Sequence, residues 1–423
     1  MFFLGIDFGT SGARSCVIDA EGAIHAEDAR DFGTLAEYER AGIWREALWD
    51  LVAALPPPLR TQLSDIALDG TSGTVIACDE ALAPRHPPLL YNDDRAVEEA
   101  ALIAKTATPG HPAAAASSGL AKVLWLKKRL GLTGARLYLN QADWLAGLLT
   151  GRVGMCDYHN ALKMGLDLDT LKWPAWVDYL ADVDYLPVPV PPGSRLATVS
   201  RPRARYLGVN PGCMVHAGTT DSIAAFLAAG VSHSGDAVTS LGSTVVLKLL
   251  SDTRVESTEH GVYSHWFGER WLAGGASNAG GAVLRQFFDD RQLAALSEQI
   301  DPAVASPLDY LPLPHTGERF PVNDPTLAPR LTPRPADDAE FLHGLLESLA
   351  RIEARGYRLL AELGATPASR VDTAGGGARN PAWTRIRQRL LGMPVAPAAH
   401  TEAAYGAALL ARDGAQCFAA RPA

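Results

Sequence analysis

Two glycine-rich turns in this sequence carry hydroxyl side chains and could bind phosphate. The first contains Gly9, Thr10, Ser11 and Gly12, and it follows an apolar run of strand character whose single carboxylate is Asp7. Glycines let backbone N–H groups approach an oxyanion closely, and the two hydroxyls add donors. Asp7 could hold a hydrated Mg²⁺ beside that phosphate. The turn is not a Walker loop, because the G-x-x-x-x-G-K-[ST] spacing is absent and a strand, rather than a helix, is predicted after it.

The second turn contains Gly242, Ser243 and Thr244, and it joins two runs of strand character at 237–241 and 245–247. It repeats the first turn in a simpler form, so we interpret the pair as a degenerate internal repeat with one phosphate hairpin in each half of the chain. Any hairpin can carry glycine and hydroxyl residues in its turn. Two such hairpins facing one another would hold a polyphosphate from both sides, and the pair therefore favours that ligand.

A third glycine-rich turn contains Gly375, Gly376 and Gly377, and it follows another predicted strand. It leads into a predicted helix that starts at an Asn-Pro pair, with Asn380 before it and Trp383 within it. Three glycines allow a flat ligand to lie against bare backbone. Asn380 and Trp383 could then flank or hydrogen-bond an adenine or a ribose.

Asp221 is the candidate catalytic residue. It follows a buried strand-like run and a Gly-Thr-Thr turn, and a helix of small residues is predicted at 223–229. A carboxylate is electrostatically favoured at a helix N-terminus. Asp221 could therefore simply cap the helix, or it could act as a general base toward a ligand held by the glycine-rich turns.

A sugar site is suggested by two further stretches. Gly-Thr-Ser-Gly occurs again at 70–73 between predicted strands, where it could serve a sugar as well as a phosphate. Asn92, Asp93 and Arg95 form a dense polar cluster after a short apolar run. Together they offer donors and acceptors for sugar hydroxyls, although Asp94 could equally cap the helix predicted to follow.

Composition limits the class of protein. The chain has 423 residues, enough for two or three domains, and 47% of them are hydrophobic and 20% charged, as in soluble globular enzymes. The net charge of −9 argues against a nucleic-acid surface, and no apolar run approaches the roughly 20 residues of a membrane helix. Five scattered cysteines, never spaced C-x-x-C, favour a reducing compartment over disulfides or zinc. We expect a cytoplasmic protein without nucleic-acid or membrane partners.

The elements that position these groups are strands followed by helices. Amphipathic or helical spacing predicts helices at 44–55, 122–130, 143–149 and 341–363, and those at 122–130 and 143–149 are expected to be mostly core-forming.

The ordered set of motifs resembles the FGGY family of carbohydrate kinases, members of the wider actin, hexokinase and heat-shock-chaperone ATPase superfamily. Residues 7–12 resemble the family's first phosphate motif and residues 241–244 its second. Residues 217–221 resemble the stretch that carries the catalytic aspartate, and residues 375–381 with Trp383 resemble the adenosine motif. The similarity spans nearly the whole chain, and the motifs occur in family order.

This resemblance implies an α/β fold of two ribonuclease-H-like domains with an interdomain cleft. The N-terminal domain, 1–228, would be the sugar-binding side, and the C-terminal domain, 229–423, the nucleotide-binding side. ATP would be the phosphoryl donor and Mg²⁺, held by Asp7, the metal. Asp221 would take the proton from the sugar's terminal hydroxyl as that oxygen attacks the γ-phosphorus.

Departures from the family pattern bear on the substrate. Xylulose and related kinases usually show a Gln-Met-His-Gly type of sequence where this chain has 70–73. The compact D-ribulose kinases of cyanobacteria and plants are similar to this chain in sharing Gly-Thr-Ser and Tyr-Asn-Asp at these places. The resemblance therefore implies D-ribulose as substrate, converted to D-ribulose 5-phosphate, with Ser72, Asn92 and Asp93 as sugar contacts beside Asp221. Asp93 could alternatively be only a structural partner of Arg95.

Two alternatives stay open. One is a kinase for xylulose, ribitol or glycerol. The other is a non-enzymatic ATP switch of the actin or chaperone kind, which the base-like Asp221 and the polar cluster at 92–95 argue against. The protein would be a monomer or a homodimer.

Overall fold

The computed structural model describes residues 1–33, 36–131 and 135–419. They form two compact units, one of Met1–Ala228 with Glu402–Cys417, and the other of Ala229–Thr401 with Phe418 and Ala419. Each unit has one large sheet and its own hydrophobic core. Within the described part of the chain, no helix combines the length and the apolar composition needed to cross a membrane.

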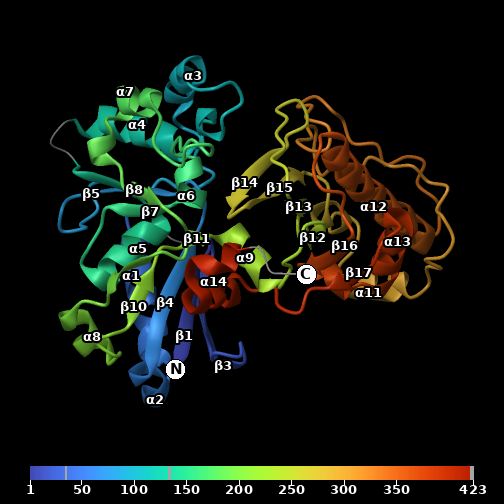
Figure 1. Ribbon diagram of the computed structural model, residues 1–423. Coiled ribbons are helices and arrows are strands. Elements are labelled where there is room, and N and C mark those ends of the chain that lie inside the picture. Colours follow the sequence, from blue (N-terminus) through green and yellow to red (C-terminus); the bar gives the residue numbers. More distant parts are fainter. Residues whose placement is uncertain (34–35, 132–134, 420–423) are drawn as a thin grey trace. The chain divides into compact units, whose positions relative to one another are not determined.

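The sheet of the first unit joins an antiparallel meander to parallel strands (Figure 1). Its order is β3-β2-β1-β4-β10-β9, and β11 also pairs with β4. β1 runs parallel to β4, and β10 and β11 run parallel to β4 as well. The strands are β1 (Phe2–Phe8), β2 (Gly12–Ile18), β3 (Ile24–Asp31), β4 (Leu63–Gly70), β9 (Arg195–Thr198), β10 (Met214–His216) and β11 (Thr219–Thr220).

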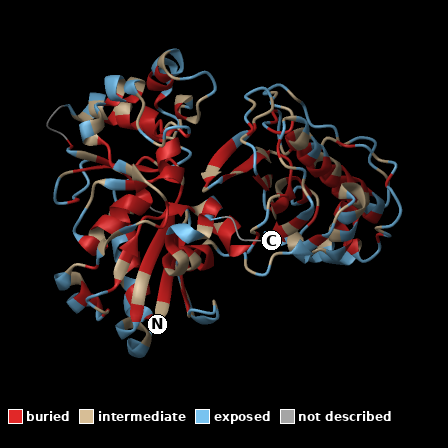
Figure 2. Ribbon diagram, in the orientation of Figure 1, coloured by how far each residue is buried: buried red, intermediate tan, exposed pale blue. Residues whose placement is uncertain are grey.

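Helices cover both faces of this sheet because its strands bury side chains on both sides (Figure 2). The helices concerned are α1 (Arg40–Ala54), α5 (Gln141–Thr150), α9 (Asp221–Ala228) and α14 (Ala403–Asp413). Leu4, Ile6 and Phe8 of β1 point into the core that includes residues of α1 and α5. On the opposite face Gly5 lies against α14, where an added Cβ would come within 2.1 Å of the Ala404 carbonyl oxygen.

Helix α14 belongs to the first unit although it lies near the C-terminus of the chain. It packs on α9 so closely that a Cβ on Gly406 would lie 1.8 Å from the Ala224 carbonyl oxygen. Any side chain at Gly406 would therefore separate the two helices. This contact holds α9, and with it Asp221, against the sheet.

Residues between β4 and β10 add a smaller layer with its own core, formed around Val75, Leu120, Val123 and Tyr138. Its elements are the paired strands β5 (Val75–Cys78) and β6 (Leu137–Asn140), and the helices α3 (Val97–Thr106), α4 (Gly119–Leu130), α6 (Tyr158–Leu162) and α7 (Ala175–Ala181). This layer carries the 70–73 turn and the 92–95 cluster.

The sheet of the second unit repeats the pattern of the first. Its order is β14-β15-β13-β12-β16-β17, in which β12, β13 and β15 form an antiparallel meander and β16 and β17 run parallel to β12. The strands are β12 (Asp236–Leu241), β13 (Val245–Ser251), β14 (Tyr263–Phe267), β15 (Arg270–Ser277), β16 (Arg370–Ala374) and β17 (Val395–Pro397). The internal repeat predicted from the two hairpins is therefore present in the topology.

A buried charged network ties the helices of the second unit to its sheet. The helices are α10 (Gly281–Leu284), α11 (Asp290–Ser297), α12 (Asp338–Glu362) and α13 (Pro381–Leu391). Arg387 of α13 donates two hydrogen bonds of 2.7 Å to Glu353 of α12, and a third of 2.7 Å to the Thr373 hydroxyl in β16. Thr239 of β12 donates to Glu353 at 2.6 Å. Both charged side chains are completely or almost completely buried.

We expect Arg387→Met to lower the free energy of unfolding of the second unit by about 3–5 kcal/mol, because it leaves the Glu353 carboxylate buried and unpaired. Urea denaturation followed by tryptophan fluorescence measures the change. Arg330→Met is the matched control, because Arg330 pairs with Asp309 at the surface of the same unit, and its loss is expected to cost about 1 kcal/mol or less. Equal losses for the two variants would contradict the prediction.

Candidate functional site

Three carboxylates gather where neighbouring parallel strands of the first sheet end. Asp7 of β1 is in register with Asp69 of β4, and Asp69 is in register with Thr219 of β11. Asp221 is the first residue of α9, directly after β11. The negative charge of Asp221 also acts on Asp69, raising its pKa. The carboxyl ends of parallel strands are where ligands of such sheets usually bind.

Asp7 is almost fully buried, with 6% of its surface exposed. Its Oδ2 lies 3.5 Å from Nη1 of Arg14, whereas its Oδ1 has no hydrogen-bond partner. Burial raises the pKa of Asp7, and the nearby Asp69 carboxyl and Arg14 guanidinium act in the opposite direction. One oxygen of this predicted metal ligand is therefore free to bind.

Asp69 is the residue that our sequence reasoning missed. It is completely buried, and neither of its carboxylate oxygens has a hydrogen-bond partner. Burial, together with the charges of Asp7 and Asp221, raises the pKa of Asp69 well above its usual range. A signal was available, because Asp69 precedes a Gly-Thr-Ser-Gly turn much as Asp7 does.

The turn at 9–12 forms as predicted between two antiparallel strands, β1 and β2. The Gly9 N–H donates to the Gly12 carbonyl oxygen at 3.0 Å, which closes the turn. Thr10 and Ser11 are exposed at its tip. Gly12 is required by close packing, because a Cβ there would lie 2.6 Å from the Arg30 carbonyl oxygen.

Buried polar side chains hydrogen-bond to the 70–73 turn. Nζ of Lys122 donates to the carbonyl oxygens of Gly73 at 2.8 Å and Ser117 at 2.7 Å. Oε1 of Gln141 accepts from both the N–H and the hydroxyl of Thr71, each at 3.0 Å. These bonds fix the backbone on either side of Ser72.

Ser72 itself has a buried hydroxyl without a hydrogen-bond partner. Nζ of Lys163 lies 3.5 Å from the Ser72 carbonyl oxygen. Burial lowers the pKa of Lys163, and the charge of Asp221 acts in the opposite direction. The structure thus brings Ser72, Lys163 and Asp221 into one neighbourhood, and Lys163 is a second residue that the sequence reasoning did not single out.

The other two predicted sugar residues are placed differently. Both carboxylate oxygens of Asp93 accept from Arg95, from Nε and Nη2 at 2.8 Å each. Asn92 is exposed. Asp93 is therefore engaged in the ion pair with Arg95 that the sequence suggested as its alternative role.

The predicted nucleotide residues lie around a cavity of about 810 Å³ within the second unit. Its walls include six predicted residues, namely Gly242, Ser243, Gly376, Gly377, Asn380 and Trp383, and the remaining two positions, Thr244 and Gly375, are outside its lining. Arginines also line it, and Nη2 of Arg285 donates to the Ser243 hydroxyl at 3.0 Å. Asp290, Glu298 and several apolar side chains complete the lining. The guanidinium groups beside the hydroxyl turn suit an anionic group of a ligand.

Asn380 and Trp383 shape this cavity through their local roles. Oδ1 of Asn380 caps α13 by accepting from the Trp383 N–H at 3.0 Å, and its Nδ2 donates to the Ser297 hydroxyl of α11 at 2.8 Å. Trp383 is 3% exposed and packs in the core of the unit. Gly375 adopts φ +81°, which favours glycine at the point where the chain leaves β16.

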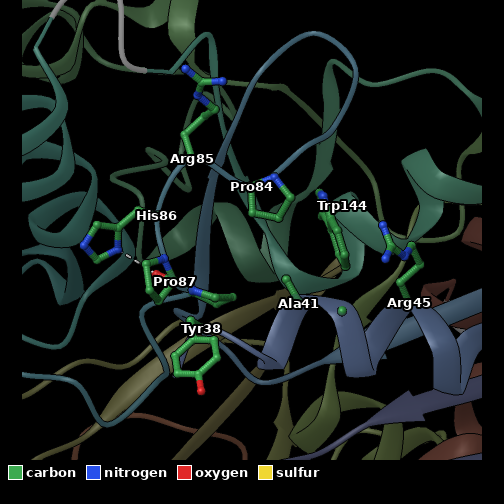
Figure 3. A pocket seen from close by; sticks show the side chains of 10 residues that line it. Tyr38, Ala41, Arg45, Pro84, Arg85, His86, Pro87 and Trp144 are labelled. Atoms are coloured by element: carbon green, nitrogen blue, oxygen red, sulfur yellow. Dashed lines mark hydrogen bonds between the residues drawn. The ribbon is translucent and has the colours of Figure 1, made fainter. Parts of the chain in front are cut away.

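A smaller cavity of about 380 Å³ lies on the first unit, away from these residues. Figure 3 shows Ala41 and Arg45 of α1 on one side of it, with Pro84 and Pro87, from the segment that follows β5, on the other. None of the predicted site residues lines it.

Comparison with known proteins gives two family matches. Residues 2–228 match the N-terminal domain of the FGGY family of carbohydrate kinases, and residues 237–412 match its C-terminal domain. Among curated relatives, the xylulose kinase of Staphylococcus xylosus is 22% identical over 455 residues, covering 99% of this chain and 92% of the relative. The gluconokinase of Bacillus licheniformis is 21% identical over 451 residues, covering 97% of this chain and 86% of the relative.

Solved structures share the fold. The chain superposes on a xyloylose kinase from Brucella ovis with a TM-score of 0.87 at 22% identity, covering 100% of this chain and 94% of that one. It also superposes on the glycerol kinase of Plasmodium falciparum, crystallised with ADP. The TM-score is 0.81 at 17% identity, and the match covers 97% of this chain and 88% of that one. The expected two-domain actin- and hexokinase-like fold is confirmed.

We expect Lys122→Met to remove a pH dependence of stability. Burial lowers the pKa of Lys122 to about 7 in the folded chain, whereas an unfolded lysine titrates near about 10.4. Between these values the unfolded chain binds more protons, so the free energy of unfolding contributed by Lys122 rises with pH. The stability of wild type relative to Lys122→Met should therefore increase as the pH rises from about 7 toward 10.

Urea denaturation at several pH values measures this difference. Lys172→Met, at an exposed lysine, controls for the loss of one positive charge. A wild-type advantage that stays constant over the range would contradict the prediction.

Proposed function

Because this chain belongs to the FGGY family of carbohydrate kinases, we propose that it phosphorylates the terminal hydroxyl of a ketopentose with ATP, and that D-ribulose is the substrate. The product would be D-ribulose 5-phosphate. The observation that carries this proposal is the neighbourhood of Ser72, Lys163 and Asp221 at the strand ends of the first unit. It offers an unpartnered hydroxyl, a cation and a carboxylate to a polyhydroxylated ligand.

Asp221 is the general base in this proposal. It accepts the proton of the sugar's terminal hydroxyl as that oxygen attacks the γ-phosphorus in line. The N-terminus of α9 stabilises the carboxylate form of Asp221, since the peptide dipoles of the helix present their positive end there. Lys163 adds a positive charge close to the same carboxylate.

The sugar is positioned by the 70–73 turn. Because Lys122 and Gln141 hold the backbone around it, the Ser72 hydroxyl meets the sugar in a fixed place. A serine leaves more room than the imidazole usual in xylulose kinases and presents a different set of donors. This difference favours D-ribulose over D-xylulose. Of the remaining candidates, Asn92 stays a proposed sugar contact, whereas the pairing of Asp93 with Arg95 favours a structural role.

The sequence-based division at 228/229 is kept for the proposed roles, except that residues 402–417 pack on the first unit. The second unit is proposed as the nucleotide side and the first unit as the sugar side. The turns at 9–12 and 242–244 supply backbone and hydroxyl donors to phosphate groups. The adenosine would lie in the cavity of the second unit, against Gly376 and Gly377, and Gly375 would set the backbone turn that leads to them. Arg285 extends its guanidinium along the same wall as Ser243.

The buried, unpartnered oxygen of Asp7 fits a divalent cation, because oxygen ligands of carboxylates are what Mg²⁺ prefers. We propose that Asp7 holds Mg²⁺. When bound, the ion offsets the negative charge of the phosphates during transfer.

A xylulose kinase is the second candidate. Several of the similar curated proteins carry that name, including those of Staphylococcus xylosus and Escherichia coli, at 22% and 24% identity. Identity this low leaves the sugar open, and the Ser72 position is the feature of this chain that separates the two candidates.

We expect D-ribulose to raise ADP release from Mg²⁺-ATP far above the rate without sugar, and Asp221→Asn to lower that increase by about 10²–10⁴-fold. A coupled assay across pentuloses, pentitols and glycerol measures both effects. Ser72→Ala should lower kcat/KM for D-ribulose by about tenfold through loss of one hydrogen bond.

Asp50→Asn, on the exposed side of α1, is the charge-matched control and should keep the wild-type rate. A different preferred sugar would refute the interpretation of Ser72 and leave the kinase intact. If no sugar raised ADP release, the proposed reaction would be wrong.

We expect Gly375→Ala to weaken ADP binding by about tenfold, equivalent to about 1.4 kcal/mol. The new Cβ would lie 2.8 Å from the Leu241 carbonyl oxygen, at the end of the strand that carries the 242–244 turn. Gly392→Ala is the matched control, because Gly392 also has a positive φ, +68°, but an added Cβ there meets no atom within 4 Å. Isothermal titration calorimetry with ADP measures both, and equal affinities would contradict the prediction.

A further inference from the structure

Asp69 is a buried carboxylate for which the reaction described so far provides no role. Its side chain has no exposed surface, and both of its oxygens lack a hydrogen-bond partner. A carboxylate buried without donors is costly, so such groups are normally paired or bound to a metal. The buried carboxylate of Glu353, by contrast, is paired with Arg387.

The position of Asp69 places it beside the proposed metal ligand. It is in register with Asp7 on the neighbouring parallel strand, and the two carboxyl groups lie near enough to interact directly. Oδ1 of Asp7 is also without a partner. Three buried carboxyl oxygens from two side chains thus lie together, and the two carboxyl groups interact with each other rather than with a donor from another described residue.

The positively charged side chains nearby do not pair with Asp69. Arg14 reaches Oδ2 of Asp7 at 3.5 Å but leaves Asp69 without an ion pair. Lys163 lies close to Asp221. Among the described residues, a positively charged side chain therefore lies near Asp7 and another near Asp221, whereas Asp69 has no ion-pair partner.

We propose that Asp69 is a second protein ligand of the divalent cation, and that it binds Mg²⁺ together with Asp7. This inference rests on the proposed function, because it concerns the metal of the same reaction. A cation between the two side chains would replace their contact with each other by attraction to a positive charge.

The composition of the site agrees with this assignment. Mg²⁺ is commonly bound by one or two carboxylates, and it keeps water and substrate phosphate oxygens as its other ligands. Two carboxylates at the edge of the sheet leave those positions open.

The test is a titration of the full-length chain with Mn²⁺ as the probe, without nucleotide, followed by electron paramagnetic resonance of the free ion. We expect wild type to bind Mn²⁺, and Asp69→Asn to bind it about tenfold or more weakly. Mg²⁺ should compete with the bound Mn²⁺. In thermal melts, Mg²⁺ should raise the Tm of wild type and raise that of Asp69→Asn much less.

Asp65→Asn is the matched control. Asp65 lies earlier on the same strand, its loss changes the net charge equally, and it pairs with His216 at 2.8 Å. It should therefore keep the wild-type Mn²⁺ affinity. If Asp69→Asn does not fold, Asp69→Glu provides the test, since its longer side chain keeps the charge and is expected to displace the carboxylate and weaken binding.

Wild-type affinity in Asp69→Asn would overturn the proposal, and so would equal losses in Asp69→Asn and Asp65→Asn. Failure of wild type to bind Mn²⁺ would also overturn it. The outcome is separate from that of the proposed function, because metal binding is measured without sugar or ATP. Absence of sugar-dependent ADP release with a normal Mn²⁺ result would refute the kinase reaction alone.

Discussion

The parallel register between β1 and β4 is the constraint on which the candidate site depends. It aligns Asp7 with Asp69, and the pairing of β4 with β11 brings Asp221 to the same edge of the sheet. A shift of one residue in either pairing would turn a carboxylate toward the opposite face. The placement of these carboxylates therefore depends on how the strands pair.

Packing on both faces of the sheet maintains that register. One face is filled by large apolar side chains, among them Leu4 and Ile6, whereas the other accepts helix α14 directly against Gly5. The close contact between Gly406 and Ala224 then holds α9 in place. These glycines allow a helix N-terminus to approach the carboxylates, and its dipole favours the negative charge there.

The second unit uses the same sheet topology for a different kind of site. Its hairpin turn and its triple-glycine turn border a cavity, whereas the equivalent edge of the first sheet carries carboxylates. Helix α13 forms part of the cavity wall, and it is anchored to the sheet and to α12 through Arg387. The side chain of Asn380 caps α13 and also binds Ser297. The shape of the cavity therefore depends on the contacts of Arg387 that hold α13 in place.

The sequence by itself determined the hairpins, the triple-glycine turn and the order of motifs, because turn chemistry and strand alternation are local properties. Those motifs were sufficient to indicate the family. Only the tertiary structure decided that Asp69 joins Asp7, that Lys163 lies near Asp221, and that Asp93 is taken by Arg95. The tertiary structure likewise decided that helix α14, although it lies near the C-terminus, packs on the first unit. Burial and pairing between distant segments are set by how elements pack, and no local pattern encodes them.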